Sequence, residues 1–217
     1  TEDELEARVT DCQERLKERC SVLTRLRCAE AKAFSNAVER QLRDLAMEKA
    51  VFSAEVRPKL PDATGADQVE FSFCANVGEP PRPLSKIASG GEISRVMLAI
   101  KSAMAGRAGV PTLVFDEVDA GLSGKAAATV ARKLEELAKH YQVIAISHLP
   151  QIASRATTHF RIEKTEASGR VRTDVRRLDE GERVEEIARM LAGEVVGESA
   201  LSHAKQMLSG SAEVLNG

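Results

Sequence analysis

Hydrophobic residues recur every three to four positions through the first fifty residues, which are rich in Glu, Arg, Leu and Ala and contain neither Pro nor Gly. This pattern predicts one long helix. Its first part fits a heptad frame whose a and d positions hold Leu5, Val9, Cys12, Leu16, Leu23 and Leu26. Only Arg19 and Glu30 break the frame. We therefore expect residues 1–48 to be the end of a coiled coil, with an amphipathic helix packed on its own domain as the alternative.

Two β-like runs follow, over residues 50–57 and 69–77, with Pro and Gly in the loop between them. They predict an antiparallel pair. Residues 78–83 are expected to interrupt the regular structure. A Ser-Gly-Gly turn then precedes apolar residues at helical spacing: Ile93, Val96, Met97, Ile100 and Met104. This spacing predicts a helix with one buried face.

The second half of the chain alternates short apolar runs with helical patterns. Residues 113–115 and 143–147 are expected to be buried strands, and residues 124–140 a helix with Val130, Leu134 and Leu137 inward. Strand, helix and strand in this order predict a parallel βαβ unit and an α/β fold. A hairpin is expected over 158–164 and 170–178, followed by two terminal helices over 182–191 and 199–208.

Composition limits the possible functions. The 217 residues are 43% apolar, enough for one compact domain with an appended element. Because 31 basic side chains face 33 acidic ones, any contact with DNA must come from a local patch. No run of 18 apolar residues and no signal-peptide pattern occurs, so we expect a soluble cytoplasmic protein. The cysteines lack metal-site spacing and are expected to be structural.

The first candidate for chemistry is the segment Ser89-Gly90-Gly91-Glu92, which opens the predicted helix. Ser89 can cap this helix, and Glu92 three residues on completes a capping box without any ligand. The two glycines extend this interpretation, because a helix start without side chains lets backbone N–H groups approach an anion. The segment is therefore either a plain cap or a grip for a γ-phosphate.

Two adjacent carboxylates, Asp116 and Glu117, end the first apolar run of the second half. Asp116 is placed to bind magnesium, and Glu117 to orient or deprotonate the attacking water of a hydrolysis reaction. The alternative is a strand that ends in two solvated acids. Asp119 lies in the turn that follows, where an Asx turn is the plain interpretation.

His148 ends the second apolar run, where a histidine can donate to a phosphate oxygen that gains charge in the transition state. A cap or a satisfied polar group is the alternative. His140, His159 and His203 are expected to be surface or packing residues. Arg170, Arg172 and Arg176 share one face of the predicted hairpin and could meet phosphates, but a solvated face balanced by nearby acids is the favoured interpretation.

These elements together are typical of an ATPase head of the ABC type, in which ligands gather at the carboxyl ends of parallel strands. The chain contains no Gly-x-x-x-x-Gly-Lys-Ser/Thr loop. Residues 121–126 resemble one only superficially, because their glycines are too close together and Ala126 has no hydroxyl for magnesium. The sequence therefore predicts half of an ATP site.

Four segments of the chain resemble the RecN family of bacterial DNA-repair ATPases, which are relatives of the SMC proteins. Residues 83–101 resemble the signature segment of the family, 115–121 its Walker B segment and D-loop, and 146–153 its switch-histidine region. Residues 186–191 are also similar, and the resemblance extends from about residue 40 to the end. It implies that residues 49–217 are the C-terminal lobe of an ABC-type head.

The resemblance also implies roles for the site residues. Two heads would enclose ATP, with Ser89, Gly90, Gly91 and Glu92 of one head facing the Walker A loop of the other. Asp116 would hold Mg²⁺, Glu117 would be the general base, His148 would contact the γ-phosphate, and Asp119 would communicate across the dimer. The implied partners are an N-terminal lobe carrying Walker A, a second head, DNA double-strand break ends and RecA, in a nucleoid-associated cytoplasmic protein without membrane contacts.

Two other functions stay open at this point. An ABC transporter ATPase would share the motifs, although the heptads of residues 5–26 weigh against it. A structural SMC-like tether, in which ATP only latches the heads, would share the heptads as well.

Overall fold

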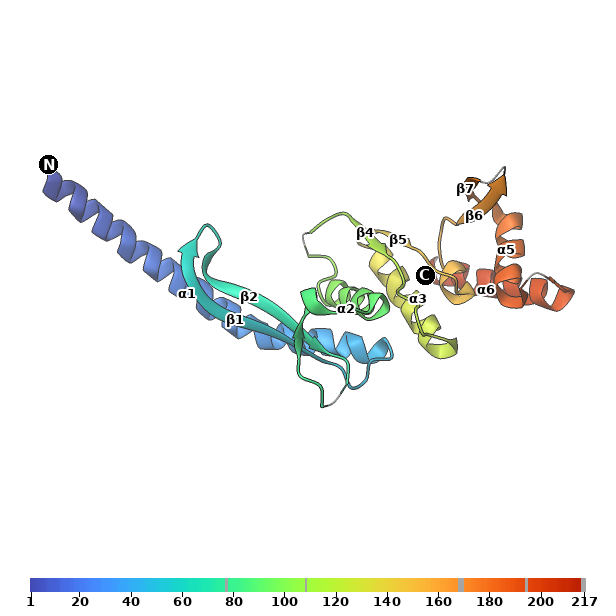
Figure 1. The fold of residues 1–217 in the computed structure, drawn as a ribbon, viewed down its shortest axis with the longest axis horizontal. Helices are drawn as coiled ribbons and strands as arrows, with labels where there is room; N and C mark the ends of the chain where they lie inside the picture. The colour runs from blue at the N-terminus through green and yellow to red at the C-terminus, as the bar shows by residue number, and fades with distance from the viewer. Residues whose placement is uncertain (77, 108, 168–169, 194, 216–217) are drawn as a thin grey trace. The chain divides into compact units, whose positions relative to one another are not determined.

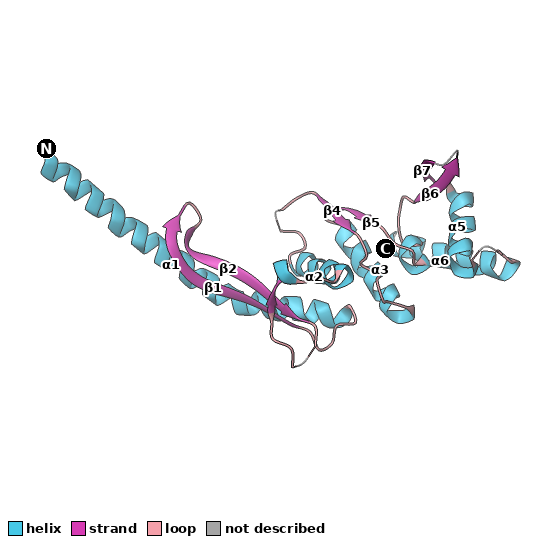
Figure 2. Ribbon diagram, in the orientation of Figure 1, coloured by secondary structure: helices cyan, strands magenta, loops and turns pink. Residues whose placement is uncertain are grey.

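The computed structural model describes residues 1–76, 78–107, 109–167, 170–193 and 195–215 of the chain. Its internal contacts divide the chain into two compact units, Thr1–Met104 and Ala105–Gly217 (Figures 1 and 2). Both units contain helices and strands, as the predicted α/β class requires. The expected boundary between residues 48 and 49 separates the long helix from the rest and stays a prediction.

The first unit begins with the predicted long helix, α1 (Glu2–Asp44). Strands β1 (Val51–Asp62) and β2 (Gly65–Cys74) form the predicted antiparallel pair, in a register that starts with Val51 opposite Cys74. Figure 1 shows this hairpin lying along α1, and the two elements are in contact. A short strand, β3 (Arg82–Pro83), adds to β2, and a 3-10 turn, η1 (Leu84–Lys86), follows.

Aromatic side chains join the hairpin to the helix. Phe34 of α1 contacts Phe52 of β1 and Phe71 of β2, with ring centroids 5.9 and 5.7 Å away, and the two strand rings are 5.5 Å apart. Phe52 is almost fully buried. Aromatic rings at these separations contribute both buried area and favourable edge contacts, so this cluster fixes the hairpin on the helix.

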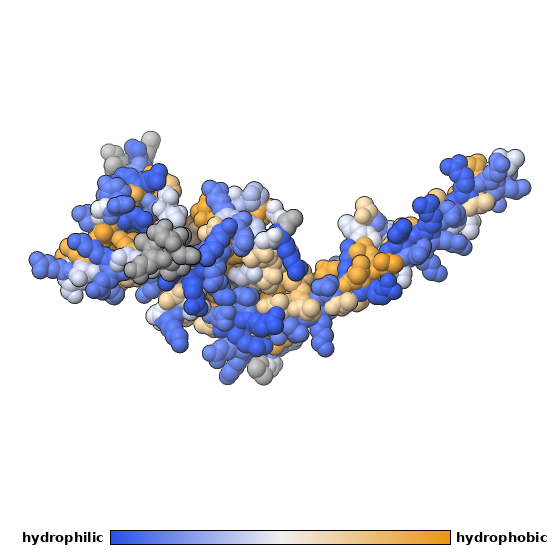
Figure 3. Space-filling model, turned by 180° about the vertical axis from the view of Figure 1, so that it is seen from behind, coloured by the Kyte–Doolittle hydropathy of each residue, from blue (hydrophilic) through white to orange (hydrophobic). Residues whose placement is uncertain are grey.

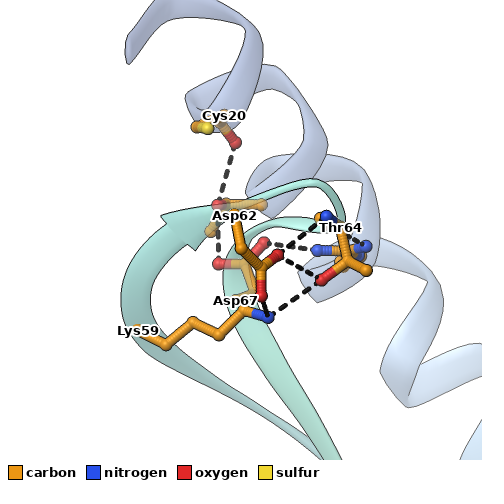
Figure 4. Close-up of polar contacts among 7 residues, drawn as sticks. Cys20, Lys59, Asp62, Thr64 and Asp67 are labelled. Atoms are coloured by element: carbon orange, nitrogen blue, oxygen red, sulfur yellow. Dashed lines mark hydrogen bonds and ion pairs between the residues drawn. The ribbon is translucent and has the colours of Figure 1, made fainter. Parts of the chain in front are cut away.

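A polar clamp fixes the tip of the hairpin to the same helix (Figure 4). The carboxylate of Asp67 is buried, and Thr24 of α1 donates its hydroxyl to Asp67 Oδ1 at 2.7 Å. Arg27 donates to Asp67 Oδ2 at 3.1 Å and to the Thr64 carbonyl at 2.8 Å. Because a buried carboxylate is costly without partners, these bonds specify where the tip docks.

The heptad residues of α1 remain accessible. Leu5, Val9, Leu16 and Leu26 are each more than half exposed, whereas Leu23 is partly covered by the tip of the hairpin at Gly65. Figure 3 shows hydrophobic residues gathered beside the hairpin and mostly hydrophilic ones toward the far end of the helix. The structure thus leaves an apolar stripe free for a second helix, as a coiled coil requires.

Helix α2 (Gly90–Ala103) begins directly after Ser89 and packs on α1. Val96, Ala99 and Ile100 form its buried stripe at i, i+3 and i+4 spacing, and Leu98 is also buried. The expectation that Met97 points inward is wrong, since this side chain is exposed. Met97 is next to Val96 in sequence, but the helical rotation carries its side chain away from the buried stripe and toward solvent.

The second unit contains the predicted parallel βαβ unit. Strand β4 (Thr112–Phe115) pairs in parallel with β5 (Gln142–Ala145), and α3 (Gly124–Ala138) connects them with its predicted apolar residues buried. The expectation that both strands are buried is half correct for β4 and wrong for β5, in which no side chain is buried. Leu113 and Phe115 are buried, but Val114 and Ile144 are 62% and 47% exposed. Side chains alternate across a strand, so β4 buries one face and leaves the other open.

The rest of this unit follows the predicted order. Strands β6 (Phe160–Ala167) and β7 (Arg170–Arg177) form the antiparallel hairpin; the turn predicted at Ser168-Gly169 lies outside the described residues. Three helices complete the unit: α4 (Pro150–Ala153), α5 (Glu180–Ala192) and α6 (Glu198–Leu215). In the described parts of the chain, we find no helix with the length and apolarity needed to span a bilayer.

Candidate functional site

The carboxyl ends of β4 and β5 meet at one edge of the parallel pair. Phe115 ends β4 and accepts a hydrogen bond from the Ile146 N–H at 2.9 Å, beyond the end of β5. Asp116 and Glu117 follow β4 directly, and His148 lies three residues after β5. The predicted acid pair and the predicted histidine therefore come from adjacent loops at the same edge.

The backbone turns sharply at Glu117. Its φ is +57°, a left-handed conformation that a residue with a side chain adopts rarely. The Glu117 carbonyl accepts a bond from the Ala120 N–H at 3.0 Å, which closes the turn. Such strained positions cost about 1–3 kcal/mol and cluster at functional sites. Both Glu117 and Asp116 are exposed, so they are accessible to a ligand.

Asp119 occupies the centre of a hydrogen-bond network at this edge. Its side chain is only 3% exposed, and Oδ2 accepts from the Ser147 hydroxyl at 2.5 Å and from the His148 N–H at 3.1 Å. The hydroxyl of Ser147 in turn accepts from the Leu149 N–H at 3.0 Å. The carboxylate expected to cap its own turn thus bonds the loop after β5. Sequence analysis missed this link, and its only signal was the hydroxyl residue directly before His148.

The side chain of His148 is 76% exposed, and its Nδ1 lies 3.2 Å from Asp119 Oδ2. The other histidines match their expected surface or packing roles. His140 and His203 are exposed, whereas His159 is partly buried. Burial lowers the pKa of His159 below its usual range, and the nearby Arg183 guanidinium lowers it further.

The segment Ser89–Glu92 belongs to the other compact unit, Thr1–Met104. Ser89 is the N-cap of α2, and its hydroxyl accepts from the Glu92 N–H at 3.3 Å. The Ser89 half of the predicted capping box is therefore present. Gly90 and Gly91 form the first turn of the helix, where the N–H groups and the helix dipole favour an anion.

Two of the three arginines expected to share one face of the β6–β7 hairpin are paired with acids, and the side chain of the third, Arg170, lies outside the described residues. Arg172 donates to Asp174 at 2.8 Å, and Arg176 forms an ion pair with Glu182 of α5. These bonds agree with the favoured interpretation of a solvated face balanced by acids. The Asp179 N–H, which donates to Glu182, and the Arg176 guanidinium both lower the pKa of that carboxyl.

The described residues contain no group of three or more His, Cys, Asp or Glu side chains that could hold a metal ion. An exposed carboxylate such as Asp116 still fits Mg²⁺, because this ion keeps several waters and is usually bound by one or two carboxylates together with substrate phosphates.

Comparison with solved structures identifies the class of fold. The Smc head domain with a coiled coil and joint from Pyrococcus yayanosii superposes with a TM-score of 0.56 at 22% identity, over 86% of this chain and 34% of that one. An Smc head domain from Pyrococcus furiosus, bound to the C-terminal domain of ScpA, gives 0.50 at 23% identity, over 85% of this chain and 44% of that one. The fold is that of an SMC head domain.

Curated relatives identify the family within this class. The chain is 46% identical over 193 residues to the DNA repair protein RecN of Halalkalibacterium halodurans, covering 87% of this chain and 34% of the relative. RecN of Haemophilus influenzae is 40% identical over 197 residues, covering 90% and 35%. No family model matches the chain. The chain belongs to the RecN family and spans about a third of the length of these relatives.

Proposed function

We propose that this chain is the C-terminal lobe of the ATP-hydrolysing head of a RecN-like protein that acts in DNA double-strand break repair and recombination. The observation that carries the proposal is the edge where Asp116, Glu117 and His148 follow two adjacent parallel strands. This edge combines a metal ligand, a base and a hydrogen-bond donor, the groups that hydrolysis of a phosphoanhydride needs.

Each residue then has a defined task. Asp116 would hold Mg²⁺, directly or through water, and the ion would supply positive charge to the phosphates of bound ATP. Glu117 orients the attacking water and accepts its proton. His148 donates to a γ-phosphate oxygen as charge develops on it. Ser89, Gly90, Gly91 and Glu92 close over the ATP of a second head, and Asp119 takes part in the same interface.

An open apolar face supports the need for a second lobe. Val114, Ile144 and Ile146 are each between 46% and 62% exposed, on or just after the two strands of the parallel sheet. Parallel sheets are normally covered on both faces, and two strands alone are marginal. We assign this face to an N-terminal lobe that also brings the Walker A loop, which this sequence lacks.

The remaining partners rest on family membership. Break ends, RecA and a cytoplasmic, nucleoid-associated location are part of the proposal, and no described residue is assigned to DNA. A transporter ATPase finds no support, because RecN relatives match nearly the whole chain. The structural tether stays as an outcome of the test below.

The test uses the intact protein with both lobes. Ser89→Arg should leave ATP binding to one head unchanged and abolish head pairing and turnover, because a long cation replaces the hydroxyl at the start of α2. Ser209→Arg, at an exposed position of α6, is the matched control and should keep full turnover. Normal turnover in Ser89→Arg would remove the signature assignment.

A second variant separates a hydrolytic cycle from a latch. Glu117→Gln should bind ATP and pair heads but lose turnover, because an amide cannot accept the proton of the attacking water. If cells carrying Glu117→Gln still repaired double-strand breaks, ATP would act only as a latch and the tether function would be correct.

A further inference from the structure

Asp119 lies between two loops and bonds both. Oδ2 of this buried carboxylate faces Ser147 Oγ, the His148 N–H and the His148 Nδ1, all within 3.2 Å. The three groups belong to the loop after β5, whereas Asp119 belongs to the loop after β4. One carboxylate oxygen therefore accepts a hydrogen bond from the backbone of His148 and lies within ion-pair distance of its ring.

We propose that Asp119 is the positioning residue of His148: it fixes the ring through Nδ1 and leaves Nε2 as the nitrogen that meets the phosphate. A carboxylate acceptor beside Nδ1 keeps the proton of a neutral imidazole on that nitrogen and sets the orientation of the ring. When both ring nitrogens are protonated, the Nε2–H donates to a phosphate oxygen while the Asp119 carboxylate lies beside Nδ1. This positioning role deepens the proposed function and rests on it for the role of His148.

The geometry of the network explains why a buried acid stands here. The His148 side chain is 76% exposed and has little packing to hold it, so its orientation must come from bonds at its base. Ser147 supplies a second attachment, because its hydroxyl donates to Asp119 and accepts from the Leu149 N–H. The loop is thereby hydrogen-bonded to Asp119 at two consecutive residues, Ser147 and His148. A histidine ring whose orientation is fixed in advance is preorganised for its ligand.

The first experiment measures the ring directly and needs no nucleotide. ¹⁵N NMR of the His148 ring in the 217-residue chain, at an alkaline pH where imidazole is neutral, reports which nitrogen carries the proton. We expect the proton on Nδ1 in the wild type and a shift toward Nε2 in Asp119→Asn. Asp174→Asn, the same change in the β7 strand, should leave the ring unchanged. A wild-type proton on Nε2 would overturn the proposal, and so would a ring unaffected by Asp119→Asn.

Ser147→Ala keeps the inference testable should Asp119→Asn fail to fold. This variant removes the hydroxyl but retains the carboxylate beside Nδ1, so the proton should stay on Nδ1. If the proton left Nδ1 of His148 in Ser147→Ala, the loop and not the carboxylate would set the tautomer, and the proposal would be wrong.

The second experiment measures ATP turnover by the intact protein. Groups that orient a metal-binding histidine are typically worth about 10–100-fold, and we expect Asp119→Asn to lower kcat by a similar factor with KM for ATP little changed. In the His148→Ala background, Asp119→Asn should have a smaller effect than in the wild type, because the residue to be positioned is gone and only the other bonds of Asp119 are lost. An equal loss factor in both backgrounds would refute the positioning role. If His148→Ala kept full turnover, the proposed function of His148 would fail, whereas the NMR result would still decide whether Asp119 orients the ring.

Discussion

The clamp at the tip of the β1–β2 hairpin predicts a large difference between two arginines of the same helix. Arg27 contacts the buried Asp67 at 3.1 Å and is itself 27% exposed. Arg15 contacts Asp11 at 3.7 Å, and both side chains are at least 65% exposed. Arg27→Gln leaves a buried carboxylate without its cation, whereas Arg15→Gln breaks an ion pair in water.

Removing one partner of a fully buried ion pair costs about 3–5 kcal/mol, and partial access of water to Arg27 reduces this to about 2–3 kcal/mol. The exposed pair of Arg15 contributes at most about 0.5 kcal/mol. Since about 1.4 kcal/mol is a factor of ten, amides that exchange when the tip leaves α1 should exchange about 30- to 100-fold faster in Arg27→Gln. In Arg15→Gln the change should be about twofold.

Hydrogen exchange followed by mass spectrometry measures this effect locally. Peptides covering residues 58–67 should show the acceleration, and peptides from α5 should not, because α5 belongs to the other compact unit. Thr24→Val removes a single bond to Asp67 and should lie between the two arginine variants. Equal exchange at the tip in Arg27→Gln and Arg15→Gln would refute the idea that the buried carboxylate holds the hairpin.

The two units support three further tests. Phe52→Ala should destabilise the first unit by about 3–5 kcal/mol in urea unfolding, because it empties the centre of the aromatic cluster, whereas an unchanged midpoint would contradict this core. Because the pKa of His159 is lowered in the folded chain, the unfolded chain binds the His159 proton more readily. The contribution of His159 to folding stability is therefore present above about pH 6.5 and lost as the pH falls through the folded pKa. Urea midpoints measured against pH should show this loss in the wild type and a flatter dependence in His159→Gln. Val114→Lys should leave the isolated chain folded by circular dichroism but prevent its association with the N-terminal lobe in gel filtration, and normal association would exclude this face as the contact.

The local pattern of the chain was enough to predict the order and type of most elements. Helical spacing without Pro or Gly identified α1, and short apolar runs with polar ends identified β4 and β5. These features are local, because a helix or a strand reveals itself within a few neighbouring residues. Since parallel strands share a carboxyl edge, the strand pattern alone was enough to place Asp116, Glu117 and His148 together.

Which side chains meet across the chain depends on the three-dimensional fold. Ser147 lies 28 residues after Asp119, and Asp67 lies 40 residues after Arg27, so neither bond has a local pattern that predicts it. The exposure of Val114 also had no signal in the sequence, since a short apolar run does not distinguish a strand that is covered on one face from one that is covered on both. Such contacts depend on which elements pair and in what register. A buried carboxylate is costly without hydrogen-bond partners, but those partners are available only once the elements have paired.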